Sequence, residues 1–221
     1  MRSRLAIALA ALAMLVAAIG PTSASAAIEF GDTCAGTDTA PGPYTLVTLS
    51  SPGGSLPLAA PISGVITKVK VNRTYPIPIP VPQLIKVLRP AGGDSYTVVN
   101  QTTVQAGIGQ TVADARMPVL AGDKLGNHGP DFTFEGSPVE GFTFYCDEEP
   151  GILGAAPGDQ GVGTTNNFPG VTEARVPLAA VIEPDADNDG FGDETQDACP
   201  QSAAFQTPCP VVTLDAVGLP G

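Results

Sequence analysis

Short runs of alternating apolar and polar residues recur along the chain, separated by glycine and proline. The clearest run covers residues 64–71. There Val65, Thr67 and Val69 share one face of an extended chain. Runs of this kind, rich in Val, Ile, Thr and Tyr, are typical of half-buried β-strands. The same pattern predicts further strands over residues 44–49, 83–88, 95–99, 111–117, 142–146 and 174–182.

Turn residues between these runs support the same fold class. Residues 90–94, Pro-Ala-Gly-Gly-Asp, predict the turn of a hairpin, and residues 121–123, Ala-Gly-Asp, predict a tight turn between two more strands. The chain holds 26 glycines and 23 prolines, which disfavours helices. About eight or nine strands at this spacing predict an all-β fold, a jelly-roll-like β-sandwich over residues 28–182.

Residues 75–82 place proline at every second position. Proline lacks the N–H that a strand donates to its neighbour, so an edge strand, a bulge or a polyproline stretch is predicted. We favour an edge that cannot pair with another sheet. The alternative is a proline-rich ligand for another protein.

The first 27 residues have the pattern of a secretory leader. Two arginines precede an almost unbroken apolar run over residues 5–19, and small residues follow. Because the run is shorter than the roughly 20 residues of a membrane span, we expect a cleaved signal peptide over residues 1–27 and no membrane span. The protein is therefore expected to be secreted, extracellular or held at the cell surface, with residues 211–221 as a C-terminal tail.

The charge of the chain narrows the choice of partners. The formal net charge is −12, and loss of the two leader arginines makes it −14. So acidic a chain repels phosphate backbones, which argues against nucleic acid as a partner. It attracts divalent cations and basic surfaces instead.

Four cysteines in an exported chain predict two disulfides. Cys199 and Cys209 lie close together in the sequence, whereas Cys34 and Cys146 bracket the predicted sandwich. Three pairings are possible, and the spacing favours Cys199–Cys209 with Cys34–Cys146. A crossed pairing would instead tie the C-terminal segment onto the sandwich.

The most specific chemistry lies in an acidic segment, predicted as a calcium-binding loop over residues 183–210. Asp185, Asp187 and Asp189 alternate, and Gly190 follows at once. Calcium takes about six to eight oxygen ligands, and aspartates at every second position of a tight loop can converge on one ion. Glycine adopts the sharp turn that convergence requires without steric cost.

The remaining ligands follow from the twelve-position scheme of an EF-hand loop. The carbonyl of Phe191 falls at position seven and Asp193 at position nine, but position twelve holds Gln196 instead of a bidentate glutamate. Asp197 and Glu194 are the alternative closing ligands. An alternative is a solvated acidic linker, because the segment holds no basic residue. The expected ligand set is Asp185, Asp187, Asp189, Phe191, Asp193 and Asp197.

The order Asp-x-Asp-x-Asp-Gly-x-Gly-Asp, followed by Asp and Cys-Pro, resembles a thrombospondin type 3 calcium-binding repeat over residues 185–200. This chain departs from the usual pattern by one extra residue before Asp197 and by holding a single copy. The resemblance implies calcium binding and an extracellular setting. About residues 60–200 also resemble a β-sandwich domain of secreted bacterial proteins that precedes such an acidic segment and has no defined activity.

Candidate catalytic groups are few. The one histidine, His128, lies in Gly-Asn-His-Gly-Pro, which predicts an exposed loop. The chain has no Gly-x-Ser-x-Gly elbow, and a single histidine cannot form a catalytic zinc site. Carboxylates crowd residues 131–149, but their spacing singles out no acid and base for a glycosidase.

We therefore expect a secreted, non-enzymatic calcium-binding protein with an adhesive, matrix-associated or surface-displayed role. Its partner would be an extracellular protein or a glycan. A carbohydrate-binding β-sandwich module is the first alternative, although the chain has no tryptophan to stack on sugars. A secreted hydrolase is the more distant alternative.

Overall fold

The computed structural model describes residues 26–40 and 43–211, and within them every regular element is a β-strand. The predicted leader over residues 1–27 lies almost wholly outside the described residues, as does most of the predicted tail over residues 211–221. The strands are β1 (Ile28–Gly31), β2 (Asp38–Ala40), β3 (Tyr44–Ser50), β4 (Gly64–Arg73), β5 (Val81–Gly92), β6 (Ser95–Ala106), β7 (Gly109–Val119), β8 (Lys124–His128), β9 (Phe132–Phe134), β10 (Ser137–Val139), β11 (Thr143–Pro157), β12 (Thr165–Asn167), β13 (Gly170–Arg175) and β14 (Leu178–Glu183).

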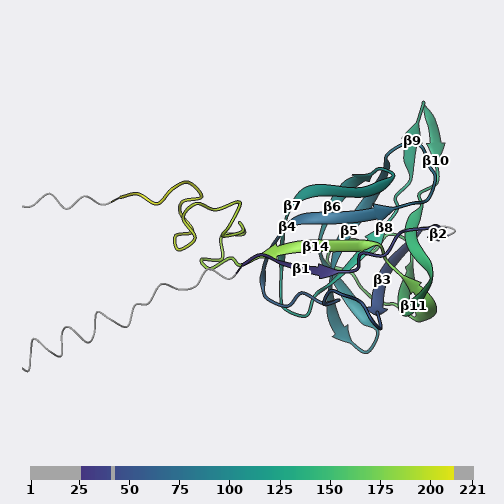
Figure 1. Ribbon diagram of the computed structural model, residues 1–221, viewed down its shortest axis with the longest axis horizontal. Helices are drawn as coiled ribbons and strands as arrows, with labels where there is room; N and C mark the ends of the chain where they lie inside the picture. Colours follow the sequence, from purple (N-terminus) through teal and green to yellow (C-terminus); the bar gives the residue numbers. More distant parts are fainter. Residues whose placement is uncertain (1–25, 41–42, 212–221) are drawn as a thin grey trace, which may run out of the picture.

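Two antiparallel sheets form a sandwich, which confirms the predicted all-β fold. The smaller sheet has the order β1-β14-β4-β7, and the larger has the order β12-β6-β5-β8-β3-β11-β13, with β2 paired to β11. The chain passes from β4 in the smaller sheet to β5 and β6 in the larger, back to β7 and again to β8. Figure 1 shows the smaller sheet lying across the strands of the larger one.

The main core fills the space between the sheets. Phe30, Val69 and Ile182 from the smaller sheet meet Ile85 and Phe144 from the larger sheet, and all five side chains are fully buried. Full burial of one such side chain contributes about 1.5–3 kcal/mol. A second, smaller cluster with Leu88, Tyr96 and Phe168 lies apart from this core and involves the larger sheet.

The predicted hairpin around residues 90–94 is present but longer than its sequence pattern. β5 and β6 pair from Val81 with Ala106 to Gly92 with Ser95, so Pro90 lies within the strand. The turn itself falls at Gly93 and Asp94, and Gly92 and Gly93 have positive φ values of 108° and 57°. The tight turn between β7 and β8 is also present, closed by the Asp123 N–H donating to the Leu120 carbonyl over 3.0 Å.

The prediction of a single strand over residues 174–182 is wrong. β13 ends at Arg175 and pairs with β11 in the larger sheet, whereas β14 begins at Leu178 and pairs with β4 in the smaller sheet. Pro177 lies between them and has no N–H to donate. The chain therefore changes sheets at this proline.

The proline-rich segment forms no strand before Val81, where β5 begins. Its prolines face solvent, while Tyr75, Ile77 and Ile79 pack against the main core. The Arg73 guanidinium, fully buried beneath the segment, donates through Nη2 to the Ile79 carbonyl over 3.0 Å. The segment is a cover over one part of the core, not a pairing edge.

The expectation that His128 lies in an exposed loop is wrong. His128 ends β8 and is only 3 % exposed. The neighbouring glycines serve close packing instead of a turn. A Cβ on Gly126 would lie 2.5 Å from a Leu88 methyl carbon, and one on Gly129 would lie 2.0 Å from the Phe142 carbonyl oxygen. Both contacts are shorter than van der Waals distance, so only glycine fits.

Two disulfides are present, Cys34–Cys146 and Cys199–Cys209, the pairs that the spacing favours. The first joins the segment after β1 to β11 across 112 residues of sequence, and the second closes a loop of 10. Disulfides of this kind point to an oxidising, extracellular-type environment. No helix among the described residues is long and apolar enough to cross a membrane.

Candidate metal centre

The acidic segment begins where β14 ends at Glu183 and extends from one end of the sandwich (Figure 1). Its backbone turns sharply at Asn188 and Gly190, which have left-handed φ values of 61° and 85°. A Cβ on Gly190 would meet no atom within 4 Å. Glycine is therefore favoured there by its backbone conformation and not by lack of space.

Three of the predicted ligands converge. One carboxylate oxygen from each of Asp185, Asp187 and Asp189 lies within 4.8 Å of the other two, so the group could hold a metal ion. Backbone amides orient these side chains. The Asp189 N–H donates to Asp185 Oδ1 over 3.0 Å and to Asp187 Oδ1 over 3.2 Å, and the Gly190 N–H donates to Asp185 Oδ2 over 3.0 Å.

Asp193 lies beside this group. Its Oδ1 accepts a hydrogen bond from the Ala186 N–H over 3.1 Å. Partial burial raises the pKa of Asp193, and the charges of Asp185, Asp187 and Asp197 raise it further, against the lowering effect of the Ala186 hydrogen bond. Several carboxylates thus repel one another within one short loop, and a divalent cation would relieve that repulsion.

Asp197 is the most buried carboxylate of the set, at 5 % exposed. Its Oδ1 accepts from the Cys199 N–H over 2.8 Å, whereas Oδ2 is buried without a hydrogen-bond partner among the described residues. Oδ2 of Asp187 is likewise buried without a hydrogen-bond partner among the described residues. A buried carboxylate oxygen with no partner is costly, and the Asp187 oxygen belongs to the three-aspartate group, so a cation bound by that group would offset this cost.

The residue at position twelve, Gln196, faces the sandwich. Its Nε2 donates to the Ala115 carbonyl over 2.7 Å, and its Oε1 accepts from the Gly192 N–H over 3.3 Å. Both ends of this amide are therefore engaged. Of the other two candidates for closing the shell, Glu194 is exposed, whereas Asp197 is buried beside Asp193. The structure does not, however, bring Asp193 or Asp197 into the group of three aspartates whose oxygens lie within 4.8 Å of one another.

The loop is fixed to the sandwich by a residue that the sequence did not single out as a site. Glu183 is buried and its Oε1 accepts from the hydroxyls of Thr67 and Thr195 over 2.9 and 2.7 Å. Its Oε2 accepts from the backbone N–H groups of Glu194 and Thr195 over 3.0 and 2.9 Å. Burial opposes ionisation, but these hydrogen bonds outweigh it and hold the pKa of Glu183 below its usual value.

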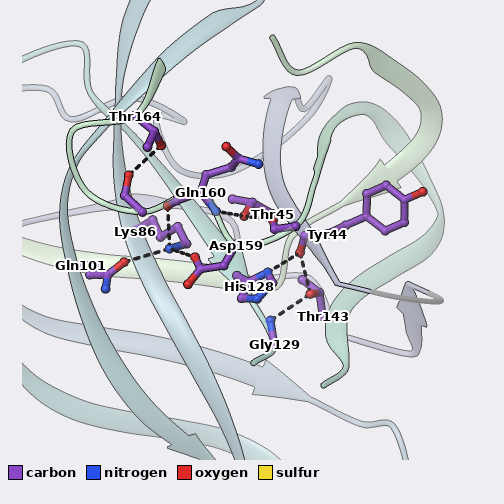
Figure 2. Close-up of polar contacts among 12 residues, drawn as sticks. Tyr44, Thr45, Lys86, Gln101, His128, Gly129, Thr143, Asp159, Gln160 and Thr164 are labelled. Carbon is purple, nitrogen blue, oxygen red and sulfur yellow. Dashed lines mark hydrogen bonds and ion pairs between the residues drawn. The ribbon is translucent and has the colours of Figure 1, made fainter. Parts of the chain in front are cut away.

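A second polar cluster surrounds Lys86 on β5 of the larger sheet (Figure 2). The wholly buried Lys86 donates through Nζ to Asp159 Oδ1 over 2.7 Å, to Gln101 Oε1 over 2.9 Å and to the Gln160 carbonyl over 2.9 Å. Three acceptors satisfy all three N–H groups of an ammonium. The cluster therefore fastens the segment after β11 to the sheet.

His128 lies near this cluster, with its Nδ1 3.1 Å from the Tyr44 carbonyl oxygen (Figure 2). Burial lowers the pKa of His128, which favours the neutral imidazole. Thr143 is nearby, but its hydroxyl donates to the Tyr44 carbonyl over 2.7 Å and accepts from the Gly129 N–H. No hydroxyl among the described residues hydrogen-bonds to the imidazole, so the arrangement lacks the nucleophile–base pair of a hydrolase.

A groove of about 370 Å³ opens over β3, β11 and β13. Leu46, Leu153 and Ala174 line it and also belong to the main core. Tyr44, 38 % exposed, and Tyr145 supply its aromatic surface. Burial raises the pKa of the Tyr145 hydroxyl, as do the neighbouring carboxylates Asp38 and Asp147.

Comparisons of the chain with protein-family models, with curated proteins and with solved structures return no match. The fold class is therefore established by the sheets themselves, and the function has to be inferred from the chemistry of the acidic loop and the groove.

Proposed function

We propose that this protein is a secreted calcium-binding protein whose acidic loop, residues 184–199, holds one calcium ion. The observation that carries the proposal is the convergence of Asp185, Asp187 and Asp189, in which Oδ2 of Asp187 is buried without a hydrogen-bond partner among the described residues. All of these groups supply carboxylate oxygen, the ligand type of calcium, and among the described residues no nitrogen or sulfur donor that would favour zinc joins them.

Asp193 and the Phe191 carbonyl complete the proposed shell. Asp193 is close enough to Asp185, Asp187 and Asp197 for their charges to add to the effect of burial and raise its pKa. Phe191 is held in place from both sides, since its N–H donates to Asp189 Oδ1 over 2.9 Å and its ring lies under the Arg116 guanidinium. The resemblance to a thrombospondin type 3 repeat supports the same assignment.

The ion has a structural role in this proposal. Glu183 and Gln196 connect the loop to β4 and β7, so an ion that orders the loop also closes this end of the sandwich. The role at the level of the organism is adhesion, matrix association or surface display, without catalysis. The two disulfides and the acidic charge support an extracellular setting, where calcium is abundant.

Calorimetric titration of the exported protein with calcium tests this proposal. We expect one site with a Kd of about 10⁻⁴–10⁻³ M, the range of extracellular modules. Asp187→Asn and Asp189→Asn should each abolish saturable binding. Asp114→Asn is the matched control, because Asp114 is an exposed aspartate on β7 paired with Lys68. Binding that survives both loop substitutions, or that is lost in the control, would refute the assignment.

A carbohydrate-binding role is the second candidate, and the groove over β3, β11 and β13 favours it. Tyr44 and Tyr145 line this groove and supply aromatic rings on which the apolar side of a sugar could pack, and Asp147, which also lines it, could accept hydrogen bonds from sugar hydroxyls. Titration with neutral hexasaccharides such as cellohexaose and maltohexaose, with Tyr44→Ala as the variant, tests it. Binding by this groove should persist in a calcium chelator, which separates it from the acidic loop.

A further inference from the structure

Gln206 lies against the aspartate cluster although it is 17 residues beyond Asp189, the residue that it contacts. Its Nε2 donates to Asp189 Oδ2 over 2.8 Å. The Cys199–Cys209 disulfide closes the loop that carries Gln206. The Gln206 carbonyl also accepts from the Ala198 N–H over 3.1 Å, which fixes the backbone of the same residue.

Two donors set the direction of the Asp189 carboxylate. The Phe191 N–H donates to Oδ1 over 2.9 Å and Gln206 donates to Oδ2 over 2.8 Å. A hydrogen bond from a neutral amide orients a carboxylate without adding a positive charge that would compete with a cation. Such hydrogen bonds to ligating carboxylates tune metal affinity, since they limit the orientations that the ligand must lose on binding.

Two carboxylate oxygens of the acidic loop are buried and accept no hydrogen bond among the described residues, so both remain available to a cation. Asp197 is only 5 % exposed, and its Oδ2 accepts no hydrogen bond. Oδ2 of Asp187 also accepts none. Gln196 is the other nearby amide, but both its ends are bound to Ala115 and Gly192. Gln206 is thus, in the part of the chain that the structure describes, the side-chain amide that donates to the three-aspartate group.

We propose that Gln206 is a positioning residue of the calcium site and that the Cys199–Cys209 disulfide belongs to the site because it holds Gln206 against Asp189. This inference rests on the proposed calcium-binding function. Gln206 acts through Asp189 and does not itself touch the ion.

Calcium titration of the exported protein and its Gln206→Ala variant tests the proposal. We expect the variant to bind calcium about tenfold more weakly, the lower end of the range for residues that hydrogen-bond to metal ligands, because this hydrogen bond is exposed. The thermal midpoint measured in a chelator should not change. Gln201→Ala is the matched control, since Gln201 is an exposed glutamine in the same disulfide loop, and it should bind like the wild type.

Gln206→Glu separates positioning from direct ligation. A glutamate would place a second negative charge against Asp189 and remove the donor, so we expect affinity at least as low as that of Gln206→Ala. Tighter binding by Gln206→Glu would mean that this side chain reaches the ion, and would overturn the positioning role.

The disulfide is tested by the pair of substitutions Cys199→Ala and Cys209→Ala, which leaves Cys34–Cys146 intact. We expect about the same tenfold loss, and adding Gln206→Ala to this background should change affinity less than about twofold, because the two act through one contact. Additive losses would overturn the proposal. Wild-type affinity in Gln206→Ala would overturn it while leaving calcium binding in place, whereas absence of binding by the wild type would refute calcium binding itself.

Discussion

The guanidinium carbon of Arg116 lies 4.3 Å from the centroid of the Phe191 ring. Arg116 belongs to β7 of the sandwich, and Phe191 lies in the acidic loop, where its carbonyl is an expected calcium ligand. The contact ties a candidate ligand to the edge of a sheet. Together with the hydrogen bonds of Glu183 and Gln196, it makes the loop a part of the sandwich end and not an independent tail.

Replacement of Arg116 by alanine should loosen the loop. An exposed cation–π contact contributes about 0.5–1 kcal/mol, so Arg116→Ala should increase cleavage by a protease between residues 184 and 199 by a few-fold in low calcium. Arg116→Lys keeps a cation above the ring, so its cleavage rate should lie between those of the wild type and of Arg116→Ala. Equal cleavage rates for all three proteins would show that the ring contact does not hold the loop.

Replacement of Glu183 should have a larger effect. Its carboxylate accepts four hydrogen bonds in a buried position, and each hydrogen bond to a charged group contributes about 1.5–3 kcal/mol. We expect Glu183→Gln to lower the free energy of unfolding by at least about 2 kcal/mol, because the amide offers donors where the site needs acceptors. Urea unfolding followed by circular dichroism measures this.

Glu29→Gln provides the matched control for Glu183→Gln. Glu29 lies on β1 and pairs with Lys70 at 2.7 Å, with a side chain that is 31 % exposed. A surface pair of this kind contributes about 0–1 kcal/mol. A loss in Glu183→Gln no larger than that in Glu29→Gln would contradict the role given to Glu183.

Protonation of His128 should destabilise the fold. Burial lowers its pKa in the folded state below the unfolded value of about 6.5, so the neutral imidazole is favoured by folding. The stability due to this shift is fully present above about pH 6.5 and is lost as the pH falls towards the folded pKa. Asp159 and Asp131 oppose the shift, and Lys86 reinforces it.

Thermal unfolding between about pH 7 and pH 5 measures the contribution of His128, because most carboxylates stay ionised in that window. We expect the midpoint of the wild type to fall across it and that of His128→Gln to fall less. An equal fall in both proteins would assign the acid sensitivity to other groups.

The two disulfides should contribute unequally to stability. Chain-entropy arithmetic gives about 4.8 kcal/mol for the 112-residue separation of Cys34–Cys146 and about 2.7 kcal/mol for the 10-residue separation of Cys199–Cys209. Paired substitutions to alanine at each bridge should therefore lower the unfolding midpoint more for Cys34–Cys146. Calcium affinity should show the opposite order, because only Cys199–Cys209 adjoins the aspartates.

Local patterns in the sequence determined the strands and the chemistry of the loop. Alternation over residues 64–71 predicts β4 because side chains of an extended chain point alternately to opposite faces. The glycines after Pro90 predict the hairpin turn because few other residues adopt positive φ. Alternating aspartates before Gly190 predict an oxygen cluster, because a glycine that turns the chain sharply lets nearby side chains converge. The structure brings Asp185, Asp187 and Asp189 together.

Tertiary structure alone decided what lies beside each local element. Gly126 and Gly129 are residues typical of a turn, yet His128 between them is buried. Leu88 and Phe142, both distant in sequence, pack so closely against the two glycines that no side chain would fit there. Lys86 is buried because Gln101 and Asp159 meet it from other segments. Glu183 joins the acidic loop to the sandwich because it accepts hydrogen bonds from Thr195 of the loop and from Thr67 of β4. Gln206 reaches Asp189 from the loop that the Cys199–Cys209 disulfide closes. Such contacts depend on how the two sheets stack and on which strands the chain connects, and a short stretch of sequence does not contain that information.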